Sequence, residues 1–167
     1  MKYCPQCKQD LHQIKEDGFP RAVCQNCHFV FYNNPRPCVM AVIMQDKRVL
    51  LYERGIEPGL GLWDLPGGFV EHMEHPEEAL KREIREELGT EIHDVRYFGV
   101  YMDRYGDEIF STLNIAYLCE LSGIPKSNSN EINKIRYFPL DSLPEKYAFP
   151  SIKNVLAGLK HGSNHAL

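Results

Sequence analysis

Residues 67–90 constrain the fold more than any other segment, because they specify a helix together with both of its ends. The segment reads GGFVEHMEHPEEALKREIREELGT. Pro76 suits the first helical position and Gly89 suits the stop. Between them the bulky apolar residues recur every four positions, as Leu80, Ile84 and Leu88. This pattern predicts a helix over 76–89 that packs one side against a core.

The same helix carries three carboxylates beside the apolar stripe. At about 100° per residue, Glu83, Glu86 and Glu87 fall within about a quarter to a third of the circumference. Like charges three or four residues apart repel, and partial burial increases the cost. A solvated face with salt bridges is one explanation. A divalent cation would remove the repulsion, and clustered carboxylates suit Mg²⁺ or Mn²⁺.

Gly67 and Gly68 precede this helix in the sequence LPGGF. A backbone without Cβ can approach a metal ion or a diphosphate closely. A pair of Gly on its own is more often a simple turn. Next to clustered carboxylates, we interpret Gly67 and Gly68 as part of a substrate-binding loop.

Four of the six cysteines lie in the first 27 residues, within the motifs CPQC and CQNC. This spacing is typical of a structural Zn²⁺ site with four thiolate ligands. The ligands would be Cys4, Cys7, Cys24 and Cys27. The metal would replace a core that about 35 residues cannot build. Two disulfides, or a rubredoxin-like iron site with the same ligands, are the alternatives. Cys38 and Cys119 lie in apolar runs and are predicted to be buried in strands.

The chain of 167 residues, 43% of them apolar, is long enough for one globular domain and a small appendage. We predict a zinc ribbon over 1–35, a larger mixed domain over 36–160 and a flexible tail over 161–167. Strands of the larger domain are expected near residues 38–44, 48–54, 94–103, 111–121 and 135–140. A second helix is expected over 151–160, after Pro150.

The net charge of −4 argues against a dedicated nucleic-acid binder, although it permits a local basic patch. No apolar stretch approaches the roughly 18 residues of a membrane span, and the N-terminus has no apolar signal region. We therefore expect a cytoplasmic protein without a membrane partner. In a reducing compartment, the cysteines are expected to bind metal and not to form disulfides.

The segment that begins at Gly68 resembles the Nudix box, G-x5-E-x7-R-E-U-x-E-E-x-G-U, where U is a bulky apolar residue. The matching positions are Gly68, Glu74, Arg82, Glu83, Ile84, Glu86, Glu87 and Gly89. Thr90 at the last apolar position is the one departure, and it changes no charged group. The resemblance extends over about residues 38–160. The N-terminal segment looks like the zinc ribbon that precedes the Nudix domain in the NADH pyrophosphatase branch.

This resemblance implies an α+β fold, an α/β/α sandwich with a mixed sheet, preceded by a small zinc ribbon. It also implies hydrolysis of a nucleoside diphosphate linked to another moiety. Glu83, Glu86 and Glu87 would bind Mg²⁺ or Mn²⁺ with the carbonyl of Gly67. Arg82 would orient these glutamates, and the carboxylate eight residues before it, Glu74, would brace the loop and the helix.

The identity of the general base and the role of Arg54 stay open. The general base varies within the family, so it is either a glutamate of the box or Glu131 on a later loop. Arg54 would contact phosphate or cap a strand. The SQPWPFP element that follows the box in NADH pyrophosphatases is absent after Thr90. Its absence argues against NADH, and against an NAD cap on RNA, as the substrate.

Other functions remain as alternatives. One is a nucleoside triphosphate pyrophosphohydrolase. Another is a binding module for nucleotides or nucleic acid, because residues 1–36 carry five basic against three acidic side chains and several aromatic ones. A structural ribbon that packs on the larger domain or on a homodimer mate is favoured over that module, since so small a charge attracts nucleic acid poorly. The complete glutamate set favours an enzyme that acts on a nucleotide.

Overall fold

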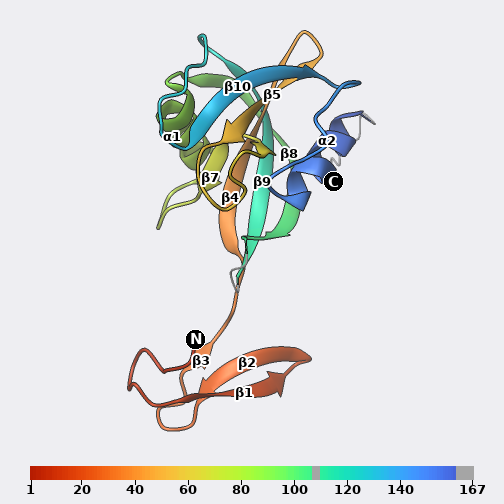
Figure 1. The fold of residues 1–167 in the computed structure, drawn as a ribbon. Coiled ribbons are helices and arrows are strands. Elements are labelled where there is room, and N and C mark those ends of the chain that lie inside the picture. Colours follow the sequence, from red (N-terminus) through yellow and green to blue (C-terminus); the bar gives the residue numbers. More distant parts are fainter. Residues whose placement is uncertain (107–109, 161–167) are drawn as a thin grey trace. The chain divides into compact units, whose positions relative to one another are not determined.

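The computed structural model describes residues 1–106 and 110–160. The chain divides into two compact units, Met1–Asn34 and Pro35–Leu167. The boundary predicted from the sequence lies one residue later, and the predicted tail over 161–167 lies outside the described residues. Each unit is described by itself below (Figure 1).

The first unit is a small antiparallel sheet in the order β1-β2-β3. Its strands are β1 (Leu11–Glu16), β2 (Phe19–Cys24) and β3 (Val30–Phe31). Two similar turns carry the cysteine pairs. In the first, the N–H of Lys8 donates to the carbonyl of Cys4 at 2.9 Å, and in the second the N–H of His28 donates to the carbonyl of Cys24 at 2.9 Å. Both donors have positive φ, 64° and 60°. The two motifs therefore fold into the same local structure.

The second unit is built on a mixed sheet in the order β10-β5-β4-β9-β8. The five strands are β4 (Arg36–Gln45), β5 (Arg48–Arg54), β8 (Ile92–Arg104), β9 (Ser111–Leu121) and β10 (Ile132–Pro139). The short strand β6 (Trp63–Asp64) pairs with β5, and β7 (Gly67–Phe69) pairs with β4. Strand β4 runs parallel to β9 and antiparallel to β5 and β7. The prediction of a mixed sheet is confirmed.

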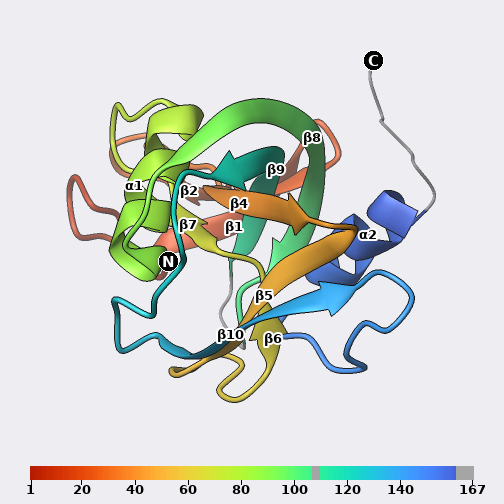
Figure 2. The same cartoon turned by 90° about the horizontal axis from the view of Figure 1, so that it is seen from above.

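The two helices α1 (Pro76–Leu88) and α2 (Pro150–Lys160) cover opposite faces of this sheet (Figures 1 and 2). The alternation of side chains along β4 explains how the sheet packs against a helix on each face. Val39 and Ile43 pack with the apolar residues of α1, whereas Met40 and Val42 pack with those of α2. Successive residues of a strand point to opposite faces, so a central strand of continuous apolar sequence supplies two cores. The predicted α+β sandwich is confirmed.

Helix α1 begins and ends as its sequence predicts. His75 caps the N-terminus by accepting a hydrogen bond from the N–H of Glu77, Pro76 is the first helical residue, and Gly89 caps the C-terminus in the left-handed conformation, with φ of 62°. The predicted end at Gly89 is one residue too long, because this glycine is the cap. Within the described residues, neither helix is long and apolar enough to cross a membrane.

Candidate active site and metal centre

A cleft of about 380 Å³ opens in the second unit, beside β7 and α1. In the part of the chain that the structure describes, six carboxylate side chains line it, from Asp64, Glu71, Glu83, Glu86, Asp103 and Glu131. Among the described residues that line the cleft, Arg54 alone is basic. So many carboxylates around one cavity repel one another and repel any anionic ligand. A cation bound in the cleft would reduce this repulsion.

Three of the five glutamates of α1, Glu83, Glu86 and Glu87, lie at or next to the side of the cleft that is called its floor below. Glu83 and Glu86 line it directly, whereas Glu87 lies behind them and is 4% exposed. The Glu87 carboxylate accepts a hydrogen bond of 2.9 Å from the N–H of Gly67. Burial raises the pKa of Glu83, and it raises the pKa of Glu87 well above the usual value. A bound cation would favour the charged form of these carboxylates, and hard oxygen donors of this kind fit Mg²⁺ or Mn²⁺.

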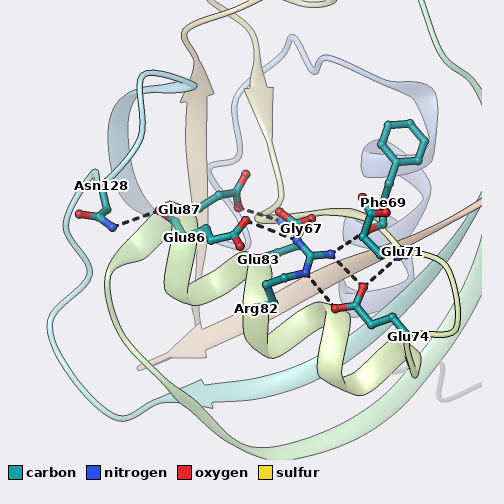
Figure 3. A network of polar contacts seen from close by, with 9 residues as sticks. All are labelled: Gly67, Phe69, Glu71, Glu74, Arg82, Glu83, Glu86, Glu87 and Asn128. Atoms are coloured by element: carbon teal, nitrogen blue, oxygen red, sulfur yellow. Dashed lines mark hydrogen bonds and ion pairs between the residues drawn. The ribbon is translucent and has the colours of Figure 1, made fainter.

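Arg82 is the centre of a polar network that holds these groups (Figure 3). Its guanidinium donates to both carboxylate oxygens of Glu74, at 2.8 and 3.0 Å, and to Glu83 at 2.8 Å. It also donates to the carbonyl of Phe69 at 3.0 Å. Glu74 in turn accepts from the N–H of Glu71 at 2.9 Å. The bidentate pair with Arg82 lowers the pKa of Glu74 to about 2. Arg82 therefore ties the helix to the end of β7 and to the loop that follows it.

The two glycines of β7 allow this close packing. A Cβ at Gly68 would overlap the carboxylate of Glu83, with the Glu83 Cδ only 2.5 Å away. A Cβ at Gly67 would overlap the carbonyl oxygen of Val39, and the φ of Gly67 is +144°. Only glycine readily adopts this φ and also lets the backbone lie so close to the carbonyl of Val39. The pair is thus required by the position of the glutamates and by the neighbouring strand.

Arg54, predicted to contact phosphate or cap a strand, lies in the cleft wall and is bonded to protein groups. Its guanidinium pairs with Asp64 at 2.9 Å and donates to the hydroxyl of Tyr52 at 3.3 Å and to the carbonyl of Pro58 at 2.6 Å. Burial raises the pKa of Asp64 to about 6, although Arg54 opposes the shift. Direct contact between Arg54 and a phosphate stays a prediction.

Sequence reasoning missed Asp64. The residue lies ten positions after Arg54, and the pairing of Tyr52 with Asp64 across β5 and β6 brings the acid to the arginine. The sequence feature that could have indicated its role is a single acidic residue within the apolar run LWDLP. A charged residue in a buried strand usually has a partner, but the sequence does not show which one.

Aromatic side chains form the other part of the cleft lining. Tyr105 stacks on Phe149 with ring centroids 5.6 Å apart, and it meets Phe69 edge-on at 5.3 Å. All three residues line the cleft. They come from the residue after β8, from β7 and from the residue before α2, so only the tertiary fold brings them together. The cleft therefore joins an acidic floor to an aromatic wall.

The cysteines of the first unit form a separate candidate metal centre. The Sγ atoms of Cys4 and Cys27 are 3.5 Å apart, those of Cys7 and Cys24 are 3.4 Å apart, and all four lie within 4.8 Å of one another. Zn–S bonds of about 2.3 Å place tetrahedral sulfurs about 3.8 Å apart. The N–H of Gln9 and the side chain of Asn26 lower the pKa of the Cys7 thiol to about 6. Four thiols that converge at these distances fit zinc.

Comparisons with known proteins agree with both units. A family model described as the NUDIX domain matches residues 34–159, and one described as Nudix N-terminal, a zinc ribbon, matches residues 2–33. The chain belongs to the Nudix hydrolase family. Enzymes of this family use divalent metals, which agrees with the acidic floor of the cleft.

Several relatives of this Nudix hydrolase are known. The NAD-capped RNA hydrolase NudC of Vibrio atlanticus is 27% identical over 87% of the chain and 52% of its own length. The chain thus spans about half the length of that curated relative. The ADP-ribose pyrophosphatase of Methanocaldococcus jannaschii is 34% identical over 71% of the chain and 69% of its own length.

Solved structures show the same fold. A MutT NUDIX hydrolase from Burkholderia pseudomallei has a TM-score of 0.69 and 31% identity, and it covers 74% of this chain and 97% of its own. A NUDIX hydrolase from Nitrosomonas europaea has a TM-score of 0.75 and 28% identity, over 98% of this chain and 94% of its own.

Within this Nudix hydrolase, Gly68→Ala is expected to weaken the binding of Mn²⁺ about tenfold or more while sparing the fold. The added Cβ meets the free end of the Glu83 side chain. The carboxylate can therefore move aside, and strand β7 does not have to shift. Calorimetric titration with Mn²⁺ and the melting temperature of the metal-free protein would measure the two effects. Gly158→Ala is the control, because its Cβ meets nothing closer than 3.4 Å. Unchanged Mn²⁺ affinity in Gly68→Ala would contradict this account of the glycine.

Proposed function

We propose that this chain is a metal-dependent hydrolase that cleaves the diphosphate linkage of a nucleoside diphosphate joined to another moiety, such as a dinucleotide or a nucleotide sugar. The observation that carries the proposal is the cleft itself, in which an acidic floor made by a Nudix box adjoins an aromatic wall. Cations bound at the floor would offset the negative charge of two phosphates. The rings of the aromatic wall would stack on a base or on a second planar moiety.

Glu83, Glu86, Glu87 and the carbonyl of Gly67 are proposed to hold Mg²⁺ or Mn²⁺ there. When bound, such ions neutralise phosphate oxygens and lower the pKa of water. Arg82 keeps the carboxylate of Glu83 in place through its 2.8 Å ion pair, and Glu74 holds Arg82. These contacts fix the carboxylates before substrate arrives, which reduces the reorganisation that binding requires.

Glu131 is proposed as the general base that accepts the proton of the attacking water at its carboxylate. Its side chain lines the same cleft as Glu83 and Glu86. Among the described residues Glu131 takes part in no ion pair, and it is exposed, so water can reach its carboxylate. The alternative base is a glutamate of the box. Glu87 suits that task less well, since it is buried and bonded to Gly67.

The names of the relatives support this class of substrate without deciding among its members. One relative is an ADP-ribose pyrophosphatase, and a structural relative of 28% identity is a UDP-X diphosphatase. The resemblance to NudC covers half of that enzyme, and the SQPWPFP element is absent from this chain. We therefore favour ADP-ribose and similar compounds over NADH or NAD-capped RNA.

A substrate screen tests the proposal. Purified protein would be incubated with ADP-ribose, NADH, FAD, diadenosine polyphosphates, a UDP-sugar and nucleoside triphosphates, with Mg²⁺, with Mn²⁺ or with EDTA, and the products identified by mass. We expect nucleoside monophosphate as a product from a diphosphate-linked compound, and none with EDTA. Pyrophosphate from triphosphates alone would instead indicate the triphosphate pyrophosphohydrolase. No metal-dependent cleavage of any compound would refute the proposal.

A further inference from the structure

The loop between β9 and β10 contacts the metal-binding helix at one end and strand β5 at the other. Its part from Lys126 to Glu131 is called the clamp loop below. Glu131 is the last residue of the clamp loop and the only one of the six that lines the cleft. The clamp loop is exposed over most of its length and contributes little to either apolar core. Its hydrogen bonds therefore determine where Glu131 lies.

At the first end, the clamp loop caps the C-terminus of α1. The last four carbonyls of a helix have no partner within it. Here the N–H of Gly89 donates to the first of them, that of Arg85, at 3.1 Å. The clamp loop supplies the rest: Asn128 Nδ2 to the carbonyl of Glu86 at 3.3 Å, Asn128 N–H to Glu87 at 3.0 Å and Lys126 N–H to Leu88 at 2.9 Å.

Asn128 thus bonds to the backbone of two of the proposed metal ligands. Figure 3 shows its side chain beside the end of the helix that carries Glu86 and Glu87. Asn128 also lies against the cap, because a Cβ added at Gly89 would be 3.7 Å from the Asn128 Cβ. Any shift of the helix end moves the start of the clamp loop with it.

At the second end, the clamp loop is fixed to the residue that follows β5. The N–H of Gly55 donates to the carbonyl of Glu131 at 2.6 Å, and Asn133 Nδ2 donates to the carbonyl of Arg54 at 3.2 Å. A Cβ at Gly55 would lie 2.6 Å from the carbonyl oxygen of Asn130 and 3.2 Å from the carbonyl carbon of Glu131. The φ of Gly55 is not in the left-handed region, so this close approach, and not the backbone conformation, requires glycine.

We propose that the clamp loop is a positioning element, in which Asn128 and Gly55 hold Glu131 at a fixed place relative to Glu83, Glu86 and Glu87. The inference rests on the proposed function, because it takes Glu131 as the base. Neither Asn128 nor Gly55 lines the cleft, so we assign both as positioning residues. Because the helix end and the clamp loop share hydrogen bonds, the proposed ligands and the proposed base are held relative to one another.

Gly55→Ala is the sharper test, because its Cβ displaces main chain beside Glu131. With ADP-ribose and Mn²⁺ as the probe, we expect kcat to fall about 10- to 100-fold with KM changed less than about twofold, as for a misplaced catalytic group. Asn128→Ala, which removes one hydrogen bond, should lower kcat by about three- to tenfold. The controls are Gly158→Ala and Asn130→Ala. The Asn130 side chain, in the same loop, makes no hydrogen bond among the described residues.

A double-mutant cycle with Glu131→Gln separates positioning from general destabilisation. If Gly55 acts through Glu131, Gly55→Ala should cause less than about a twofold further loss in the Glu131→Gln background. An equal loss in both backgrounds would overturn the inference, and so would full activity of Glu131→Gln. In either of those outcomes the proposed function stands, because the wild-type protein still cleaves ADP-ribose in a metal-dependent way.

Hydrogen exchange in the metal-free protein tests the clamp loop without any activity. The amides of Lys126 and Asn128, which donate to the helix end, should exchange at least about tenfold faster in Gly55→Ala, whereas those within α1 should not change. If these two amides keep their protection, the two ends of the clamp loop are not coupled and the inference fails. This result decides the question even if the substrate screen finds no cleavage.

Discussion

Replacing Glu87 with Gln is expected to lower kcat by at least about 100-fold, since it removes the charge of a proposed metal ligand and keeps its shape. The Gln side chain can still accept the hydrogen bond that Gly67 donates at 2.9 Å. Steady-state hydrolysis of the best substrate in the screen, with Mn²⁺ varied, would measure the loss. Glu77→Gln is a control, because Glu77 is an exposed acid in the first turn of the same helix. Unchanged activity of Glu87→Gln on every diphosphate would refute the metal assignment.

The same substitution should also change how stability depends on pH without metal. Burial raises the pKa of Glu87 in the folded protein, so the folded state holds its proton more tightly than the unfolded state. The resulting stability is present below the unfolded pKa, about 4.3, and is lost as pH rises through the folded pKa. Metal-free Glu87→Gln should therefore lose less stability than the wild type as pH rises from about 5 to neutral. Thermal melts in EDTA would test this expectation.

Cys4→Ser is expected to remove bound zinc and unfold residues 1–34 while metal-dependent hydrolysis persists. Cys4 is 2% exposed, and its sulfur lies 3.5 Å from that of Cys27. A structural zinc site contributes roughly 10–16 kcal/mol in small zinc-binding peptides, far more than a sheet of this size can replace. Metal analysis should find about one zinc per wild-type chain. Limited proteolysis would follow the first unit, and the substrate assay would follow the second.

Cys119→Ala provides the control for that experiment. Cys119 is buried in β9, far along the sequence from the four clustered cysteines, and should leave the zinc content unchanged. Two findings would contradict the assignment. One is a Cys4–Cys7 disulfide in protein kept reduced. The other is a zinc content in Cys4→Ser equal to that of the wild type.

Local sequence predicted the features that depend on neighbours along the chain. The caps, the apolar stripe and the acidic flank of α1 lie within one segment, and the helix was predicted to within one residue. The two cysteine pairs could also be recognised from local sequence, because each pair lies on one turn. Three strands extend beyond their predicted starts, since β4 begins at Arg36, β8 at Ile92 and β10 at Ile132. Strands β8 and β10 contain register shifts that allow pairing to continue past the apolar run.

The amino-acid sequence alone specifies the chemical groups of this protein: a helix with three carboxylates along one flank, a glycine pair before it and four thiols in two turns. The neighbours of these groups depend on the three-dimensional fold. Asp64 meets Arg54 only because β6 pairs with β5, and Glu131 lies near the glutamates only because its loop caps α1 and bonds to Gly55. Such contacts join residues 10 to about 80 positions apart. No periodicity or spacing encodes them, because they depend on sheet order and on shared backbone hydrogen bonds.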